Sequence, residues 1–185
     1  MARKEVRFTG VGGQGILLMA VLYARAASKK GYYVTNVPEY GAEKRGSLST
    51  SDVVISREEI GFPKCLRPSM LVIMHQKGYD ANLTFIKKAK MLVLDSDMVQ
   101  VKVKGLLIPA TRIAHGVGSK MTANIVMLGA LAAVDETIDL ASLLEAIDET
   151  LPSASITMNV KALNAGYEFM ISKEQVINKM RPIHR

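Results

Sequence analysis

The glycine-rich stretch 10–15, Gly-Val-Gly-Gly-Gln-Gly, has residue types and spacing suited to binding an anion. An alternating segment, 5–9, precedes it, and a segment rich in helix formers, 16–24, follows directly. Glycine permits positive φ angles, and the first amides of a helix stay free at the positive end of its dipole. We therefore expect a phosphate or carboxylate site at Gly10, Gly12, Gly13, Gln14 and Gly15. The carboxamide of Gln14 would donate to the ligand or bridge to a neighbouring subunit.

Other functions for this stretch remain open from the residues alone. Its spacing satisfies the dinucleotide pattern G-x-G-x-x-G, but a nicotinamide site also needs an acidic residue about twenty positions later. Asn36 stands there instead. The phosphate loop of nucleoside triphosphatases is disfavoured because no Gly-Lys-Ser/Thr follows. The glycines could also serve only a tight turn between strand and helix.

A second candidate site is the polar segment 38–47, which we expect to be an exposed loop. It presents Tyr40, Glu43, Arg45 and Gly46, and we expect these four residues to contact a partner protein. The alternative is a solvated connection with no partner.

Two weaker candidates follow predicted strands. His75 and Gln76 come after the apolar segment 70–74, at the strand end where α/β sheets bind ligands. Asp95 and Asp97 could bind a metal or act as acid and base, but with no third ligand nearby we expect a polar turn.

These residues must be positioned by alternating strands and helices. The pattern predicts a single three-layer α/β domain spanning 1–185, Rossmann-like, with a mostly parallel sheet, a βαβ opening that contains the glycine turn, and a polar tail from about 172. We expect strands at 5–9, 32–37, 47–56, 70–74, 91–94 and 106–108, and helices at 15–30, 79–88, 119–134, 139–150 and 156–170.

Composition narrows the function classes. The net charge of +7 suits anionic ligands or acidic partners, but no basic run with interleaved aromatics indicates nucleic acid. The single cysteine, Cys65, cannot form an internal disulfide or hold an iron–sulfur cluster. No apolar run reaches the roughly eighteen residues of a membrane span, and no secretory leader is visible. We expect a cytoplasmic protein that binds no metal.

Two motifs together resemble a known family. The stretches 10–15 and 40–46 are similar to the GxGGQG and YGxExRGG signatures of the gamma subunit of 2-oxoacid:ferredoxin oxidoreductases, which act on pyruvate, 2-oxoglutarate or ketoisovalerate. Looser similarity covers 51–56, 124–131 and 159–167. Ser47 departs from the pattern, since the family commonly has a second glycine there.

The resemblance implies a partner role in a larger enzyme. Such complexes convert a 2-oxoacid, coenzyme A and oxidised ferredoxin into acyl-CoA, carbon dioxide and reduced ferredoxin. Thiamine diphosphate, Mg²⁺ and iron–sulfur clusters would belong to the alpha and beta subunits or to a delta subunit. The gamma subunit would be non-catalytic, would shape the approach of coenzyme A and could contact one of its phosphates; 2-oxoglutarate is the favoured substrate. The alternatives are a stand-alone nucleotide-binding oxidoreductase and a ligand-binding module.

Overall fold

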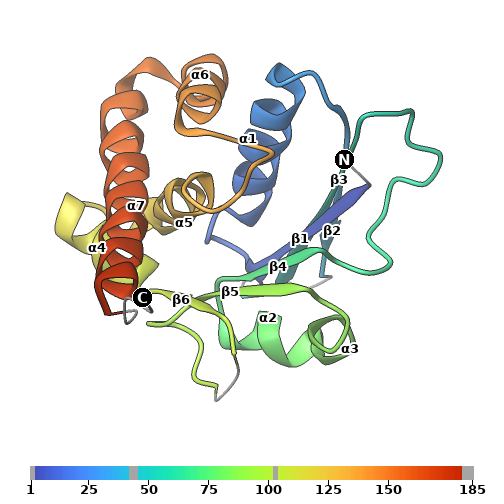
Figure 1. Cartoon of the computed structure of the whole chain (residues 1–185), viewed down its shortest axis with the longest axis horizontal. Helices are drawn as coiled ribbons and strands as arrows, with labels where there is room; N and C mark the ends of the chain where they lie inside the picture. Colours follow the sequence, from blue (N-terminus) through green and yellow to red (C-terminus); the bar gives the residue numbers. More distant parts are fainter. Residues whose placement is uncertain (1–2, 42–45, 102–103, 181–185) are drawn as a thin grey trace, which may run out of the picture.

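A central sheet of six strands organises the molecule (Figure 1). The computed structural model describes residues 3–41, 46–101 and 104–180. The strand order is β2-β3-β1-β4-β5-β6; β3 runs antiparallel to both of its neighbours and the other pairs are parallel. The predicted α/β fold is confirmed, with a mixed sheet. The strands are β1 Lys4–Val11, β2 Tyr33–Tyr40, β3 Leu48–Ser56, β4 Met70–Ile73, β5 Met91–Asp95 and β6 Leu106–Ile108.

Helices cover both faces of the sheet (Figure 1). Alternate residues of β4 face opposite sides: Val72 belongs to the main core with α1 and α5, whereas Leu71 and Ile73 pack in a smaller core with residues of α2 and α3. The helices are α1 Ile16–Lys29, α2 Gln76–Ala81, α3 Leu83–Ile86, α4 Ala110–Val117, α5 Ala123–Ala132, α6 Leu140–Thr150 and α7 Ser153–Met180, with a 3-10 turn, η1, at Lys120–Thr122.

The predicted βαβ opening is wrong in one respect, because β3 lies between β1 and β2. Val53 of β3 pairs with Val6 on one side and with Asn36 on the other. The strand β3 is buried from Ser49 to Ile55, and its apolar residues Val53, Val54 and Ile55 gain from a central place, whereas no residue of β2 is buried. Pro38 has no backbone N–H and is tolerated at the sheet edge. Residues 38–40, expected in a loop, therefore belong to this edge strand.

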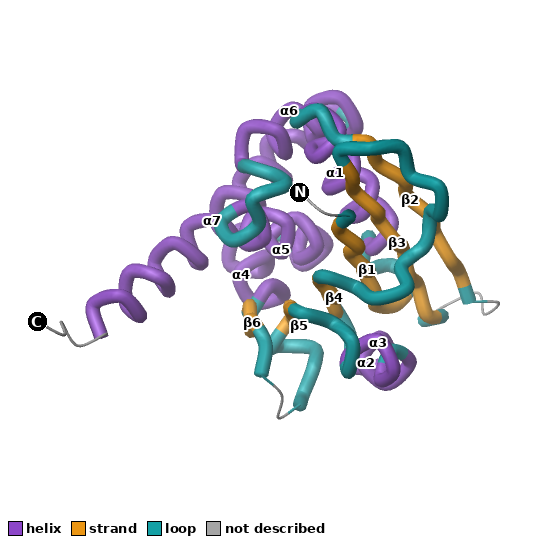
Figure 2. Tube along the Cα trace, turned by 45° about the vertical axis from the view of Figure 1, so that its right-hand side comes forward, coloured by secondary structure: helices purple, strands orange, loops and turns teal. Residues whose placement is uncertain are grey.

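Two helices also differ from expectation. The helix predicted at 79–88 is divided into α2 and α3 at Asn82, whose side-chain amide donates to the carbonyl of Gly78 at 2.8 Å and to Thr9. The last helix, predicted to end near 170 before a polar tail, continues to Met180. Figure 2 shows its carboxyl-terminal end extending away from the rest of the molecule.

The helices α5 and α7 pack backbone against backbone at two glycines. A Cβ atom added at Gly129 would overlap the carbonyl oxygen of Leu163, and one added at Gly166 would overlap that of Val126. Only glycine allows this close approach.

Within the described ranges, no helix has the length and apolar character needed to cross a membrane.

Candidate functional site

The glycine turn lies where the direction of strand connections changes. From β1 the chain proceeds through α1 to β2 at one edge of the sheet, while β4, the other neighbour of β1, leads to β5 and β6. Ligands of open α/β sheets bind outside the carboxyl ends of strands at such a switch point. The turn follows the carboxyl end of β1, so its position is that of a ligand site.

The backbone of the turn leaves amide groups open at the start of α1. Gly13 has φ +94° and Gly15, the residue before the helix, has φ +68°, both in the left-handed region that favours glycine. Met19 N donates to Gly15 O at 2.9 Å, the first bond of the helix. Among the described residues, no acceptor binds the amides of Gly13 and Gly15. These amides and the first turn of α1 can therefore donate to an anion.

Gln14 holds the turn in place. Its Oε1 accepts from Val11 N at 3.0 Å, and its Nε2 donates to Met74 O at 2.9 Å, which ties the end of β1 to the end of β4. The carboxamide expected to reach a ligand or neighbour is thus engaged within the chain. Gly10 makes room for it, because an added Cβ would lie 2.6 Å from Gln14 Oε1 and 2.7 Å from Ile16 Cδ1.

Two further residues fix the other side of the turn. Gly12 N donates to Ser47 O at 2.9 Å, so this amide is not open to a ligand. Asn124 of α5 donates from Nδ2 to Gly15 O at 3.1 Å, and a Cβ at Gly15 would overlap that nitrogen. The buried Oδ1 of Asn124 has no partner among the described residues. Sequence reasoning missed this brace because Asn124 lies far from the turn in the chain.

A cavity of about 190 Å³ opens in front of these amides. Its walls are the turn, the first residues of α1, Tyr40 of β2 and the hydroxyl-bearing Ser47 and Ser49. No acidic side chain of the described residues lines it. The cavity therefore offers hydrogen-bond donors without a carboxylate to repel an anion.

The second predicted site meets the first at this cavity. Tyr40, at the end of β2, is 72% exposed and lines it. Gly46 has φ +65°, and its carbonyl accepts from Lys77 Nζ at 3.3 Å, which brings a cation to the same end of the sheet. Glu43 and Arg45 lie outside the described residues.

The weaker candidates have structural partners. Nδ1 of His75 accepts from Lys77 N at 3.1 Å and caps α2, and Gln76 donates to Asp80. Both line a separate polar cavity of about 390 Å³ with Asp97.

The predicted polar turn forms at the two aspartates. Asp95 accepts from Thr111 Oγ1 at 2.6 Å, and Asp97 pairs with Arg112 at 2.9 Å. Burial raises the pKa of Asp95 despite the Thr111 bond, which favours the charged form. In the described part of the chain, no three His, Cys, Asp or Glu side chains converge as a metal site.

The sheet order argues against a nicotinamide site. In a dinucleotide fold the acidic residue ends a strand adjacent to the first strand. Here β3 separates β2 from β1, which places β2 about 10 Å away. Asn36 accepts from Ser51 Oγ at 2.7 Å within the sheet.

Comparisons with known proteins agree with the two motifs. The family model described as pyruvate ferredoxin/flavodoxin oxidoreductase matches residues 5–169. The 2-oxoglutarate synthase subunit KorC of Methanocaldococcus jannaschii is 39% identical over 180 residues, covering 93% of this chain and 95% of that protein. The ketoisovalerate oxidoreductase subunit VorA of Methanothermobacter thermautotrophicus is 35% identical, covering 89% of this chain and 36% of that protein.

The fold agrees as well. The crystal structure of a keto/oxoacid ferredoxin oxidoreductase gamma subunit from Geobacter sulfurreducens superposes with a TM-score of 0.78 at 31% identity, covering 91% of this chain and 99% of that one. The chain belongs to the pyruvate ferredoxin/flavodoxin oxidoreductase family, and its type is that of the gamma subunit.

Proposed function

We propose that this chain is the non-catalytic gamma subunit of a complex that converts 2-oxoglutarate, coenzyme A and oxidised ferredoxin into acyl-CoA, carbon dioxide and reduced ferredoxin in the cytoplasm. Residues 1–185 would act as one gamma-type domain. The similarity to KorC supports the substrate, since it covers nearly the full length of both chains. VorA, which is also similar in sequence, is named for another 2-oxoacid, so other substrates belong in the test.

The cofactors of the reaction would be held by alpha and beta subunits or by a delta subunit. Thiamine diphosphate with Mg²⁺ would supply the decarboxylation, and iron–sulfur clusters would carry electrons to ferredoxin. The residues of this chain do not fit an iron–sulfur cluster. Its one cysteine, Cys65, is buried, and its amide donates to Asp52, whereas a cluster usually needs four thiolates.

The observation that carries the proposal is the set of open amides in front of the 190 Å³ cavity. Coenzyme A is rich in phosphate, and a phosphate is bound by backbone amides at a helix start. We assign Gly13 and Gly15 as donors, with Gly10, Gly12 and Gln14 as positioning residues. The gamma subunit would thus hold one phosphate of coenzyme A while the partner subunits perform the chemistry.

The segment from Tyr40 to Gly46 would contact an alpha or beta subunit. Support comes from the exposed ring of Tyr40 beside the cavity. Burying this aromatic side chain against a partner would stabilise the assembly. Arg45→Ala would then reduce assembly with the partners, as measured by co-purification, and leave the melting temperature of the isolated chain unchanged.

Reconstitution tests the proposed function. The chain is combined with its alpha and beta partners, and ferredoxin reduction is measured with 2-oxoglutarate, pyruvate, ketoisovalerate or indolepyruvate as substrate. The complex should reduce ferredoxin only with coenzyme A present, and fastest with 2-oxoglutarate. The isolated chain should be inactive. Turnover of a 2-oxoacid by the isolated chain would contradict the proposal.

A further inference from the structure

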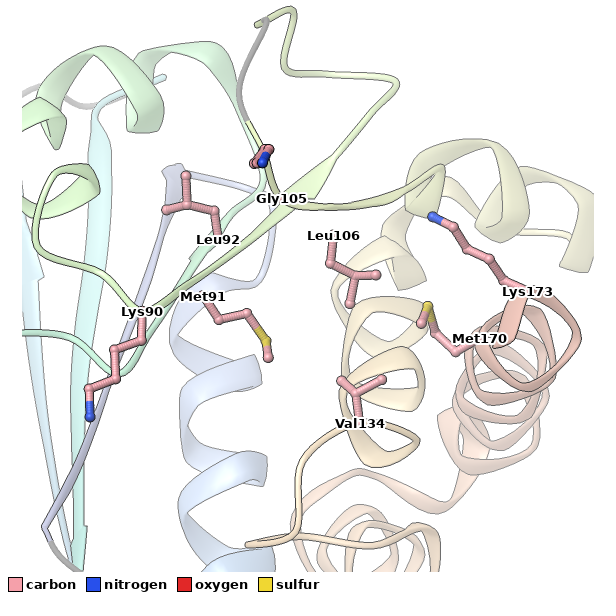
Figure 3. A pocket seen from close by; sticks show the side chains of 9 residues that line it. Lys90, Met91, Leu92, Gly105, Leu106, Val134, Met170 and Lys173 are labelled. Atoms are coloured by element: carbon pink, nitrogen blue, oxygen red, sulfur yellow. The ribbon is translucent and has the colours of Figure 1, made fainter. Parts of the chain in front are cut away.

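A larger cavity lies at the opposite end of the sheet from the glycine turn. It occupies about 540 Å³ beside the first residues of β5 and β6, and α7 forms its far wall (Figure 3). Small-molecule sites typically measure about 300–1,000 Å³, so the space suits a compact ligand. The function proposed for the glycine turn does not use this cavity.

The floor of the cavity is apolar and adaptable. It is formed by Met91, the first residue of β5, by Leu106, the first residue of β6, by Val134 after α5, and by Met170 of α7. Met91 is 38% exposed although its side chain is apolar. Methionine side chains adjust their shape to an apolar guest, and covering the exposed Met91 removes apolar surface from water.

The rim of the cavity is cationic. Lys90, Lys104 and Lys173 line it, and no acidic side chain of the described residues does. Figure 3 shows Lys90 and Lys173 on opposite sides of the floor. Lys173 Nζ is anchored, since it donates to Leu107 O at 3.2 Å. For Lys90 and Lys104, no ion pair is found within the described ranges.

Two acidic residues line a neighbouring cavity. An adjoining cavity of about 220 Å³ shares Met91 and Val134 and contains Asp135 and Glu136. Asp135 is already paired with Lys4, so its charge is compensated. An anionic group is therefore favoured beside the rim lysines rather than beside Glu136.

We infer that this cavity binds a small amphipathic carboxylate, with its aliphatic chain on Met91, Leu106 and Met170 and its carboxylate at the lysine rim. The apolar floor provides most of the affinity, and the lysines provide the preference for an anion.

Methionine-methyl NMR of the full chain tests this inference with two probes of equal chain length, octanoate and octanol. Octanoate should shift the Met91 and Met170 signals saturably and bind roughly fivefold more tightly than octanol, as expected for exposed cations. The variant K90Q/K104Q should remove that preference. The control K87Q/K88Q removes two exposed lysines outside the cavity and should keep it.

Three outcomes would overturn the inference. The two methionine signals could stay unchanged on addition of octanoate, the two probes could bind equally well, or K87Q/K88Q could act like K90Q/K104Q. In a fourth outcome, the two methionine signals change only when alpha and beta subunits are added, which would overturn the inference and assign the cavity to a protein partner. Unshifted signals from the other methionines would show that each variant is folded.

Discussion

Replacing Gly166 by alanine should separate two helices that now touch through their backbones. The added methyl group would overlap the carbonyl oxygen of Val126, and it would lie 3.1 Å from Ala130 N. Both are backbone atoms of α5, which is buried against the sheet, so neither can rotate away. The helix α7 must therefore shift outward.

The expected size of the effect follows from two opposing contributions. Overpacking typically costs about 1–3 kcal/mol, and a rigid backbone contact puts Gly166→Ala at the upper end. Alanine favours a helix over glycine by about 1 kcal/mol, which offsets part of the loss. The net fall in the free energy of unfolding should be about 2 kcal/mol, or roughly 4–8 °C in melting temperature for a chain of this size.

Gly116→Ala is the matched control. Gly116 lies in α4, and an added Cβ would have no neighbour within 4 Å. This variant should be as stable as the parent or more stable by up to about 1 kcal/mol. Urea unfolding followed by circular dichroism compares the two variants. If Gly166→Ala behaves like Gly116→Ala, the close crossing of α5 and α7 is refuted.

Three further predictions concern buried or capping groups. Asp139 caps α6 and accepts from Lys30 and Ser142, contacts that lower its pKa to about 2. Asp139→Ala should cost about 1 kcal/mol at pH 7. A lowered pKa stabilises the fold fully above the unfolded value near 4, and this stabilisation is lost as the pH falls through the folded value, so thermal melts should show the cost shrinking between about pH 4 and about pH 2. Tyr23→Phe removes a 2.5 Å hydrogen bond to Asp135 and should cost about 1–3 kcal/mol in urea unfolding, whereas the exposed control Tyr33→Phe should cost nothing measurable. Burial acts to raise the pKa of Asp135, but Lys4 and the hydrogen-bond donors around the carboxylate lower this pKa overall, so Asp135 accepts the bond as a charged group. Burial raises the pKa of the Cys65 thiol, and nearby Asp52 raises it further, so a thiol reagent at pH 8 should label it only after unfolding; rapid labelling of the folded chain would contradict its burial.

Local patterns in the sequence predicted most of the strands. The unbroken apolar run at 70–74 indicated a strand buried on both faces in a parallel sheet, and β4 has that place between β1 and β5. The helix predicted at 15–30 is likewise present as α1, and Gly31, with φ +81°, follows its carboxyl-terminal cap Lys30.

The sheet order could not be predicted in the same way. Whether β2 or β3 pairs with β1 depends on the surroundings of the whole strand: β3 is buried from Ser49 to Ile55 although four of these seven residues are polar, and no residue of β2 is buried. Contacts between distant residues were missed for the same reason. Gln14 binds a carbonyl 60 residues later, and Asn124 binds one 109 residues earlier, so neither partner is visible in the local sequence.

A charge placed at the rim of the glycine cavity tests the central claim most directly. Ser47 lines that cavity, and its backbone carbonyl, which holds Gly12, is unaffected by a change of side chain. Ser47→Asp and Ser47→Asn have nearly the same shape and differ in charge. A carboxylate about 5 Å from a bound phosphate is repelled by roughly 3 kcal/mol at an effective dielectric constant near 20, and screening by salt reduces this to about half.

The measurement is the KM of the reconstituted complex for coenzyme A. Ser47→Asp should raise it by about tenfold, while Ser47→Asn leaves it near the parent value and neither changes the KM for 2-oxoglutarate. Equal KM values for coenzyme A in the Asp and Asn variants would contradict the assignment of the glycine turn as the phosphate site.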